Sequence, residues 1–110
     1  MDEAEFRRHS DRALDSLKRS LLQAEESAEI EVEENAGALK VSFEEPPGTF
    51  VISPNSPVKQ IWISALSTSF KLDWSAIVSG FVLAKTGEDL KTLLSRLINE
   101  QLGEQAVSLK

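Results

Sequence analysis

The sequence predicts an α+β fold, a two-layer α-β sandwich in which two helices pack on one face of an antiparallel sheet. Apolar residues recur at helical spacing near both ends of the chain, and between these segments they alternate with polar residues, as in strands. Each helix has one apolar face to bury, and the sheet offers one apolar face, so the two layers cover each other. A chain of 110 residues is enough for one domain, which we expect over residues 1–110.

The first helix is predicted over residues 3–24, where the apolar residues share one face. They are Phe6, Ala13, Leu14, Leu17, Leu21 and Ala24. On the opposite face, charged residues of mostly opposite sign follow one another every four positions, so this helix compensates most of its own charge. The single histidine, His9, lies near the apolar side, where we expect it to pack or to face solvent.

Alternation with a period of two predicts the strands. We expect them at residues 29–34, 38–44, 49–53, 59–64, 70–74 and 77–84. Gly37 tolerates the positive φ that a tight turn between the first two strands requires. Pro54 and Pro57 are expected to end the third strand.

A second helix is predicted to open within residues 86–89, with Thr86 or Glu88 as its N-terminal cap. Its apolar stripe contains Leu90, Leu93, Leu94, Leu97, Ile98 and Leu102. Gly103 is expected to end the helix, because glycine readily adopts the left-handed conformation found at helix C-termini.

The segment KQIWIS, residues 59–64, indicates which sheet face stays open. Alternation places Ile61 and Ile63 on the side covered by the helices, and it places Gln60 and Trp62 on the other side. The residues expected on the open side are Glu29, Glu31, Glu33, Lys40, Ser42, Glu44, Gln60 and Trp62. The sequence therefore predicts an exposed tryptophan among polar and charged neighbours.

Two interpretations of Trp62 are open. The indole can simply pack over its neighbours, with Lys40 or Lys59 against the ring. Alternatively, it anchors a protein interface, where tryptophan is enriched. We favour the interface, because the residue stands on a flat polar sheet.

Composition excludes several classes of function. No run of 18 apolar residues occurs and the first residues are charged, so we expect no membrane span, no secretion signal and a cytoplasmic location. The absence of cysteine excludes disulfides and thiolate sites, and a single histidine argues against a closed zinc site or a hydrolytic triad. We therefore do not expect an enzyme.

Negative charge is concentrated in one segment. Residues 25–45 contain eight acidic side chains and one lysine, a net charge of −7, whereas the other 89 residues contain ten acids and eleven bases, a net charge of +1. Such a segment repels nucleic acid and attracts cations or a basic protein surface. A solvated face that only aids solubility is the simpler alternative. Carboxylates in an open row suit hard cations, including iron, but they would bind them weakly because no closed coordination shell forms.

The sequence resembles the frataxin family; it is closer to the bacterial CyaY-type members in length and N-terminus, and closer to the mitochondrial members in PVKQIWIS. NSPVKQIWIS followed by LDW, with EFRRHSD at the start and NAGALKVSFE before it, carries the resemblance, which extends from Glu5 to about Leu109. It implies a protein of iron–sulfur cluster assembly that binds Fe²⁺ or Fe³⁺ with low affinity. It also implies docking on a cysteine desulfurase and its scaffold protein. We expect a monomer, with iron-driven oligomers left open.

The resemblance also assigns residues. By position, the acidic ridge that binds iron would consist of Asp11, Glu25, Glu26, Glu29, Glu31, Glu33 and Glu44. Gln60 and Trp62 match the family's sheet residues, and with Glu31 and Glu33 they would contact the partner.

Two departures from the family pattern stand out. The last turns of the first helix, usually rich in acids, read Lys18, Arg19, Leu22 and Gln23, which shifts the expected cation site toward residues 25–33. The asparagine that normally follows the third strand is replaced by Ser53, with Asn55 two residues on.

Three hypotheses follow. The first is a weak iron binder that feeds or regulates cluster assembly, and the second is an acidic protein-binding regulator with incidental metal binding. A third, a ferroxidase, ranks last because no closed ligand set is visible in the sequence.

Overall fold

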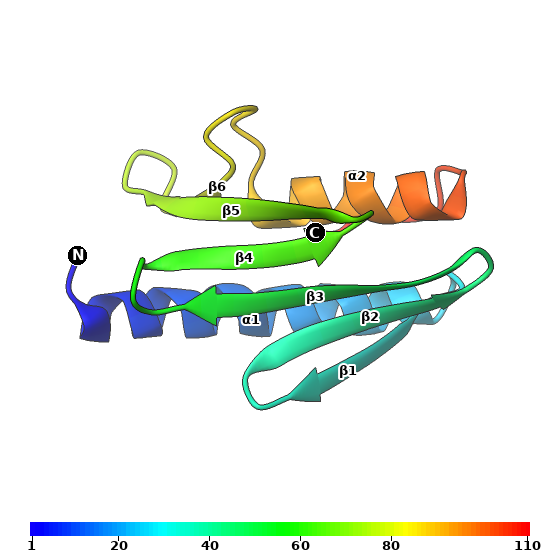
Figure 1. Ribbon diagram of the computed structural model, residues 1–110, viewed down its shortest axis with the longest axis horizontal. Helices are drawn as coiled ribbons and strands as arrows, with labels where there is room; N and C mark the ends of the chain where they lie inside the picture. The colour runs from blue at the N-terminus through cyan, green and yellow to red at the C-terminus, as the bar shows by residue number, and fades with distance from the viewer.

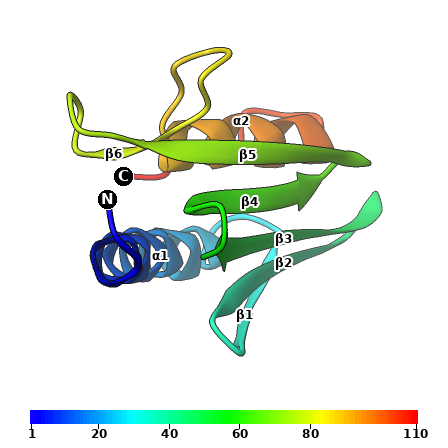
Figure 2. The same ribbon diagram turned by 60° about the vertical axis from the view of Figure 1, so that its left-hand side comes forward.

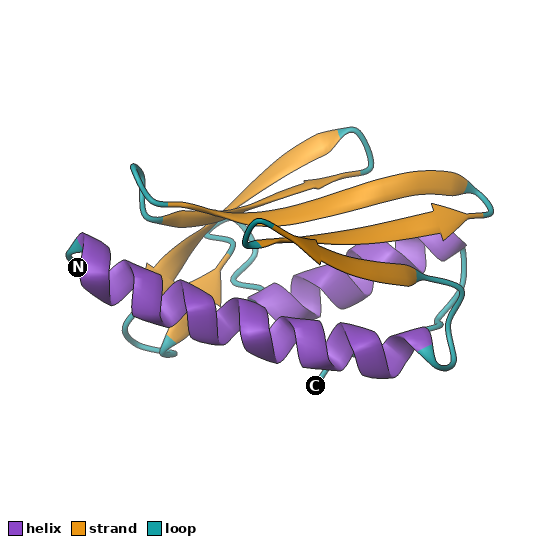
Figure 3. Cartoon of the chain, turned by 90° about the horizontal axis from the view of Figure 1, so that it is seen from below, coloured by secondary structure: helices purple, strands orange, loops and turns teal.

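The structure, a computed structural model, describes residues 1–110 and contains two layers. Two helices flank six consecutive strands in the chain, and both helices lie side by side on one face of the sheet (Figures 1 and 3). We call the sheet face against the helices the covered face and the other the open face. The predicted fold class is thus confirmed.

Helix α1 spans Glu3–Glu25, one residue beyond the predicted end. The Asp2 carboxylate caps it by accepting a hydrogen bond from the Glu5 backbone N–H at 2.8 Å. Two of its predicted four-residue charge pairs form, Glu3 with Arg7 and Asp15 with Arg19. The helix therefore keeps its charged face in solvent and turns its apolar face toward the sheet.

Helix α2 spans Leu90–Leu102 and is capped by Asp89, which accepts a hydrogen bond from the Thr92 N–H. The prediction of Thr86 or Glu88 as the cap was wrong, because the chain before Asp89 forms a separate turn. In that turn the N–H groups of Thr86 and Gly87 both donate to the Leu83 carbonyl. Gly103 ends the helix with a φ of 72°, as predicted.

The six strands form one antiparallel sheet in chain order, from β1 at one edge to β6 at the other (Figures 1 and 2). Their bounds are β1 Glu31–Asn35, β2 Ala38–Glu44, β3 Pro47–Asn55, β4 Gln60–Ala65, β5 Thr68–Ser75 and β6 Gly80–Val82. The turn between β1 and β2 has positive φ at Ala36 (52°) and Gly37 (84°), which matches the twist of the two strands.

The third strand runs through Pro54, although Pro54 was predicted to end it. Pro54 pairs with Ile61 of β4, but on its other side β2 pairs only as far as Ile52. Pro54 thus lies at a locally unpaired edge, where a missing N–H breaks no ladder bond.

The last strand is also shorter than predicted. Only residues 80–82 of the expected 77–84 belong to it, and residues 76–79 form a turn. Glu29 likewise lies before β1, in the loop that follows α1.

The core lies between the layers and contains 21 buried apolar residues. Leu17 and Leu94 from the two helices meet Ile52, Ile61 and Leu72 from the covered face, and each of these five is at most 1% exposed. All buried side-chain polar atoms have a hydrogen-bond partner. Neither helix combines the length and the apolar composition that crossing a membrane requires.

The chain after α2 is fastened to the helices. The Asn99 side chain accepts hydrogen bonds from the N–H groups of Ala106 and Val107 and donates one to the Val107 carbonyl, at 2.8–2.9 Å. The Ser20 hydroxyl donates to the Lys110 carbonyl, which ties the end of the chain to α1. Val107 is buried, so this tail extends the core.

Candidate functional site

Four of the predicted ridge carboxylates line one hollow of about 420 Å³ at the edge of the sheet. We call it the acidic hollow; its residues are Glu25, Glu29, Ile30, Glu31, Ser42, Phe43 and Glu44. It forms where α1 has ended and β1 begins, so that the end of β2 lies open beside the connecting loop. Ile30 and Phe43, which line the acidic hollow, are buried and belong to the core, whereas the carboxylates are the charged part of its lining.

Glu25 stands at an electrostatically unfavourable place. It is the last residue of α1, Glu26 is the C-terminal cap, and no basic residue occurs in the last turn. The C-terminus of a helix carries a partial negative charge, so acidic side chains there are destabilising. One Glu25 oxygen accepts a hydrogen bond from the Val32 N–H at 2.8 Å, which offsets part of this cost and fixes the carboxylate beside β1.

The other predicted ridge residues lie outside the acidic hollow. Glu33 is exposed on the open face opposite Lys40, one side-chain pair along the edge strand from Glu31. Asp11 is 14 residues before Glu25 on the same helix, or roughly 21 Å at 1.5 Å per residue. The structure therefore gathers the acids near residues 25–44 and leaves Asp11 apart.

Lys18 neutralises one acid of this region. Glu34 points toward the covered face, and its carboxylate accepts a hydrogen bond from the Lys18 ammonium at 2.7 Å. Lys18, a departure from the family's acidic helix end, thus lowers the charge of the helix side. The four glutamates that line the acidic hollow form no ion pair.

The donor chemistry of the acidic hollow fits iron, but its geometry is open. Carboxylate oxygens are hard ligands that suit Fe²⁺ and Fe³⁺. No three acidic or histidine side chains converge closely enough to hold a metal ion. The residues can therefore attract a cation electrostatically and contact it through one or two carboxylates, which favours weak binding.

The open face has Trp62 near its centre, half-buried by its neighbours. Its indole N–H donates to the Gln60 side-chain oxygen at 2.9 Å, and the Gln60 amide donates to the Asp73 carboxylate at 2.9 Å. The Lys71 ammonium lies over the ring, 4.9 Å from its centroid. The cation on the ring is thus Lys71, and the expectation of Lys40 or Lys59 was wrong.

Register explains this arrangement. Trp62 is paired with Lys71 across β4 and β5, and Gln60 is paired with Asp73, so all four side chains share the open face. Sequence reasoning missed Lys71 and Asp73 because the register between these strands was unknown. The two-residue turn that fixes this register, Leu66 and Ser67, has positive φ at both positions but contains none of the residues that mark such a turn in a sequence.

The two candidates for the family's asparagine share a face. Ser53 is paired with Trp62 and Asn55 with Gln60, both inside β3. Because residues two apart on a strand point the same way, Asn55 is presented on the open face beside Gln60. Val51, 38% exposed, lies further along the same row.

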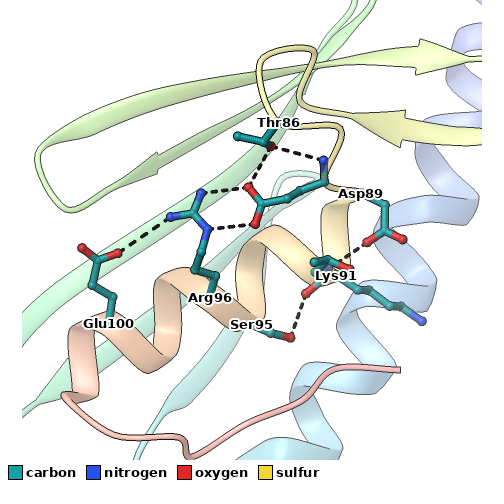
Figure 4. Close-up of polar contacts among 8 residues, drawn as sticks. Thr86, Asp89, Lys91, Ser95, Arg96 and Glu100 are labelled. Atoms are coloured by element: carbon teal, nitrogen blue, oxygen red, sulfur yellow. Dashed lines mark hydrogen bonds and ion pairs between the residues drawn. The ribbon is translucent and has the colours of Figure 1, made fainter.

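A separate polar network joins the start of α2 to the preceding loop (Figure 4). The Arg96 guanidinium donates to both oxygens of Glu88, at 2.8 and 2.9 Å, and the Thr86 hydroxyl donates to one of them. These hydrogen bonds, chiefly that from Arg96, lower the pKa of Glu88 below its ordinary value of 4.5. The hydrogen bond with Glu88 also raises the pKa of Arg96. The charges of Glu88 and Arg96 are already paired with each other, so this network serves to hold the start of α2 in place.

His9 packs against the second tryptophan. Its ring stacks on Trp74 with centroids 3.9 Å apart and an interplanar angle of 21°. Trp74 in turn meets Phe81 edge to face at 5.3 Å. This histidine joins α1 to β5, so of the two roles expected for it, packing is the one observed.

The fold and the two surfaces define a class: a small α-β sandwich with an acidic edge and an open polar sheet that displays a tryptophan. The family model of the frataxin-like domain matches residues 1–104. The chain therefore belongs to the frataxin family.

Relatives support this membership. The chain is 30% identical over 94 residues to a protein of Azotobacter vinelandii named iron-sulfur cluster assembly protein CyaY, with 84% of each chain covered. It is 32% identical over 78 residues to the protein of the same name in Pseudomonas fluorescens, covering 70% of this chain and 69% of that one.

Solved structures agree in fold. Frataxin from Psychromonas ingrahamii superimposes with a TM-score of 0.82 at 20% identity and covers all of both chains. Yeast frataxin superimposes with a TM-score of 0.70 at 25% identity, over 91% of this chain and 82% of that one.

Proposed function

We propose that this protein takes part in iron–sulfur cluster assembly by binding Fe²⁺ or Fe³⁺ weakly in the acidic hollow and docking on a cysteine desulfurase and its scaffold. The curated relatives are named for cluster assembly. The observation that carries the iron role is the concentration of unpaired acids at the C-terminus of α1, where they are destabilising unless a cation is near. The protein acts in the cytoplasm and is not an enzyme.

Weak binding suits delivery. An ion held by one or two carboxylates exchanges readily, whereas an ion in a closed shell does not. The acidic hollow opens at the edge strand, beside the open face that carries Trp62. A partner seated on that face would lie next to the ion.

An anaerobic Fe²⁺ titration followed by amide NMR tests the iron role. Signals of Glu25, Glu29 and Glu31 should broaden first, and Glu31→Gln should weaken binding by about fivefold or more, since even two unit charges at 4 Å contribute about 1 kcal/mol in water and Fe²⁺ carries two. Asp11→Asn, an equal change of charge outside the acidic hollow, should have a smaller effect. If the amide signals of Glu25, Glu29 and Glu31 do not change at millimolar iron, the proposed iron binding is wrong.

The second candidate is a protein-binding regulator whose metal binding is incidental. The absence of converging ligands favours it. Reversing the charges of Glu31 and Glu33 should then slow association with the desulfurase in a salt-dependent way, and Trp62→Ala should mainly speed dissociation. Docking that survives both changes would eliminate the docking model. Oxygen consumption with Fe²⁺, compared with buffer, separates a ferroxidase from either.

A further inference from the structure

The turn between β5 and β6 exposes two aliphatic side chains that the fold does not use. Ile77 is 97% exposed and Val78 is 59% exposed. No charged residue occurs between Ser75 and Gly80. Val58, on the β3–β4 turn at the same end of the sheet, is 53% exposed as well (Figure 1). Single exposed aliphatic residues are ordinary, but Ile77, almost wholly exposed, stands next to the exposed Val78, and together we call them the apolar knob.

A hollow of about 390 Å³ lies at the base of this knob, between α1 and the turn. We call it the turn hollow; it is lined by His9, Arg12, Ala13, Trp74, Ser79 and Gly80. The stacked rings of His9 and Trp74 and the Ala13 methyl group give it an apolar wall. Ile77 of the same chain leaves it free, because that side chain is almost wholly in solvent.

We propose that a second copy of this chain fits this surface. Ile77 and Val78 of one copy would enter the turn hollow of the other, and the reverse contact would form at the same time. The apolar knob and the turn hollow both include residues of the β5–β6 turn. A two-fold axis beside that turn would therefore place the knob of each copy in the turn hollow of the other. Such an isologous contact closes after two copies.

Charges around the turn hollow support self-association. Arg12 lines the hollow, and Arg8 and Glu5 lie four and seven residues before it on the same side of α1. None of the three forms an ion pair within the molecule. Across a two-fold axis, Glu5 of one copy can meet an arginine of the other.

A lipid surface fits this region less well. Binding to an anionic bilayer needs an excess of cations near the apolar residues. The protein has a net charge of −6, and acids accompany the arginines along the first turns of α1. The mixture of signs therefore favours a second copy.

The dimer should be weak. Two aliphatic side chains and the rim of a small hollow bury far less than the ~800 Å² per partner of a stable complex. A dissociation constant on the order of 0.1 mM is the natural expectation for so small a contact. The turn hollow is also some 13 residues along α1 from Glu25, roughly 20 Å, so association leaves the acidic hollow open.

Sedimentation and NMR dilution of the metal-free protein in EDTA test the proposal. Sedimentation should depend on concentration, and dilution should move signals of residues 5–13 and 75–80 alone. Ile77→Ser removes an exposed side chain without touching the core, and it should weaken the dimer at least tenfold, since each dimer loses two buried isoleucines. The control is Leu22→Ser, which also replaces an exposed aliphatic side chain by serine. Leu22 is 41% exposed on α1, away from the turn hollow, so this change should leave the dimer unaffected.

A charge exchange sharpens the test. Glu5→Arg and Arg12→Glu should each weaken self-association, and an equal mixture of the two variants should associate more strongly than either alone. A protein that stays monomeric at millimolar concentration overturns the proposal, as does a dimer equally sensitive to Ile77→Ser and Leu22→Ser. Binding of the monomeric protein to anionic vesicles, lost in Ile77→Ser, would overturn it in favour of lipid.

Discussion

The two tryptophans of this protein stand on opposite faces of one sheet and do different work. Trp74, on the covered face, stacks on His9 of α1 and meets Phe81, so it joins the layers. Trp62, on the open face, donates a hydrogen bond to Gln60 and lies beneath the Lys71 ammonium, both on its own sheet. The comparison teaches that the covered face supplies stability, whereas the open face is free to receive the partner under the proposed function. Each face can therefore be altered without the other.

The sharpest way to break this comparison uses neighbours in β4. Ile61→Ala should lower the free energy of unfolding by about 3 kcal/mol, because Ile61 is fully buried and its loss leaves a cavity. Trp62→Ala removes a larger side chain but should cost only about 1 kcal/mol. Urea unfolding measures both. Equal losses would mean that the open face also holds the fold.

The second test concerns the helix layer, where the Asn99 side chain holds the residues that follow α2. Asn99→Ala removes three hydrogen bonds to Ala106 and Val107 and should cost about 2 kcal/mol. Amide exchange of Val107 should speed up accordingly. Asn55→Ala, the same substitution on the open face, is the control and should change stability little.

The Glu88–Arg96 pair predicts a pH dependence. Glu88→Gln should cost about 1 kcal/mol at pH 7, because the pair is doubly hydrogen-bonded but Arg96 is half exposed. The folded-state pKa of Glu88 is lowered, so its contribution is present above the ordinary value of 4.5 and disappears as pH falls through the folded value. The difference between wild type and variant should vanish in acid. Glu100→Gln, which removes only a 3.9 Å contact to Arg96, should show almost none of it.

The smallest effect has the opposite sign. Glu31→Gln should raise stability by about 0.5 kcal/mol at low salt, because it relieves repulsion among the acids of the acidic hollow. The gain should fade at high ionic strength. Glu34→Gln, at an acid already paired with Lys18, should bring no gain. A loss of stability in Glu31→Gln would show that this carboxylate is part of the fold.

Alternation in the sequence was enough to predict the layers and the faces. Ile61 and Trp62 were separated correctly because a strand has only two sides, and α1 was predicted to within a residue because its apolar stripe is unbroken. The boundaries failed where tertiary context decides. Pro54 stays in β3 only because β2 ends before it, and Asp89 caps α2 because the residues before it form their own turn.

The binding surfaces were predicted in part for the same reason. The acids near residues 25–45 could be found by counting charge, but their gathering into one hollow depends on where β1 begins relative to β2. Lys71 could not be assigned to Trp62 without the strand register. Ile77 and Val78 were predicted to belong to a strand, because in a sequence apolar residues of a turn cannot be told from apolar residues of a strand.

The order of the sheet also governs how the chain can assemble. Every strand pairs with its neighbours in sequence, so the sheet can grow hairpin by hairpin as the chain leaves the ribosome. Helix α2 and the tail emerge after the last strand, and until then Leu72 and Phe81 have only part of their cover. Helix α2 and the residues after it thus close the layer, which makes the nascent sheet, and not the folded domain, the form most exposed to aggregation.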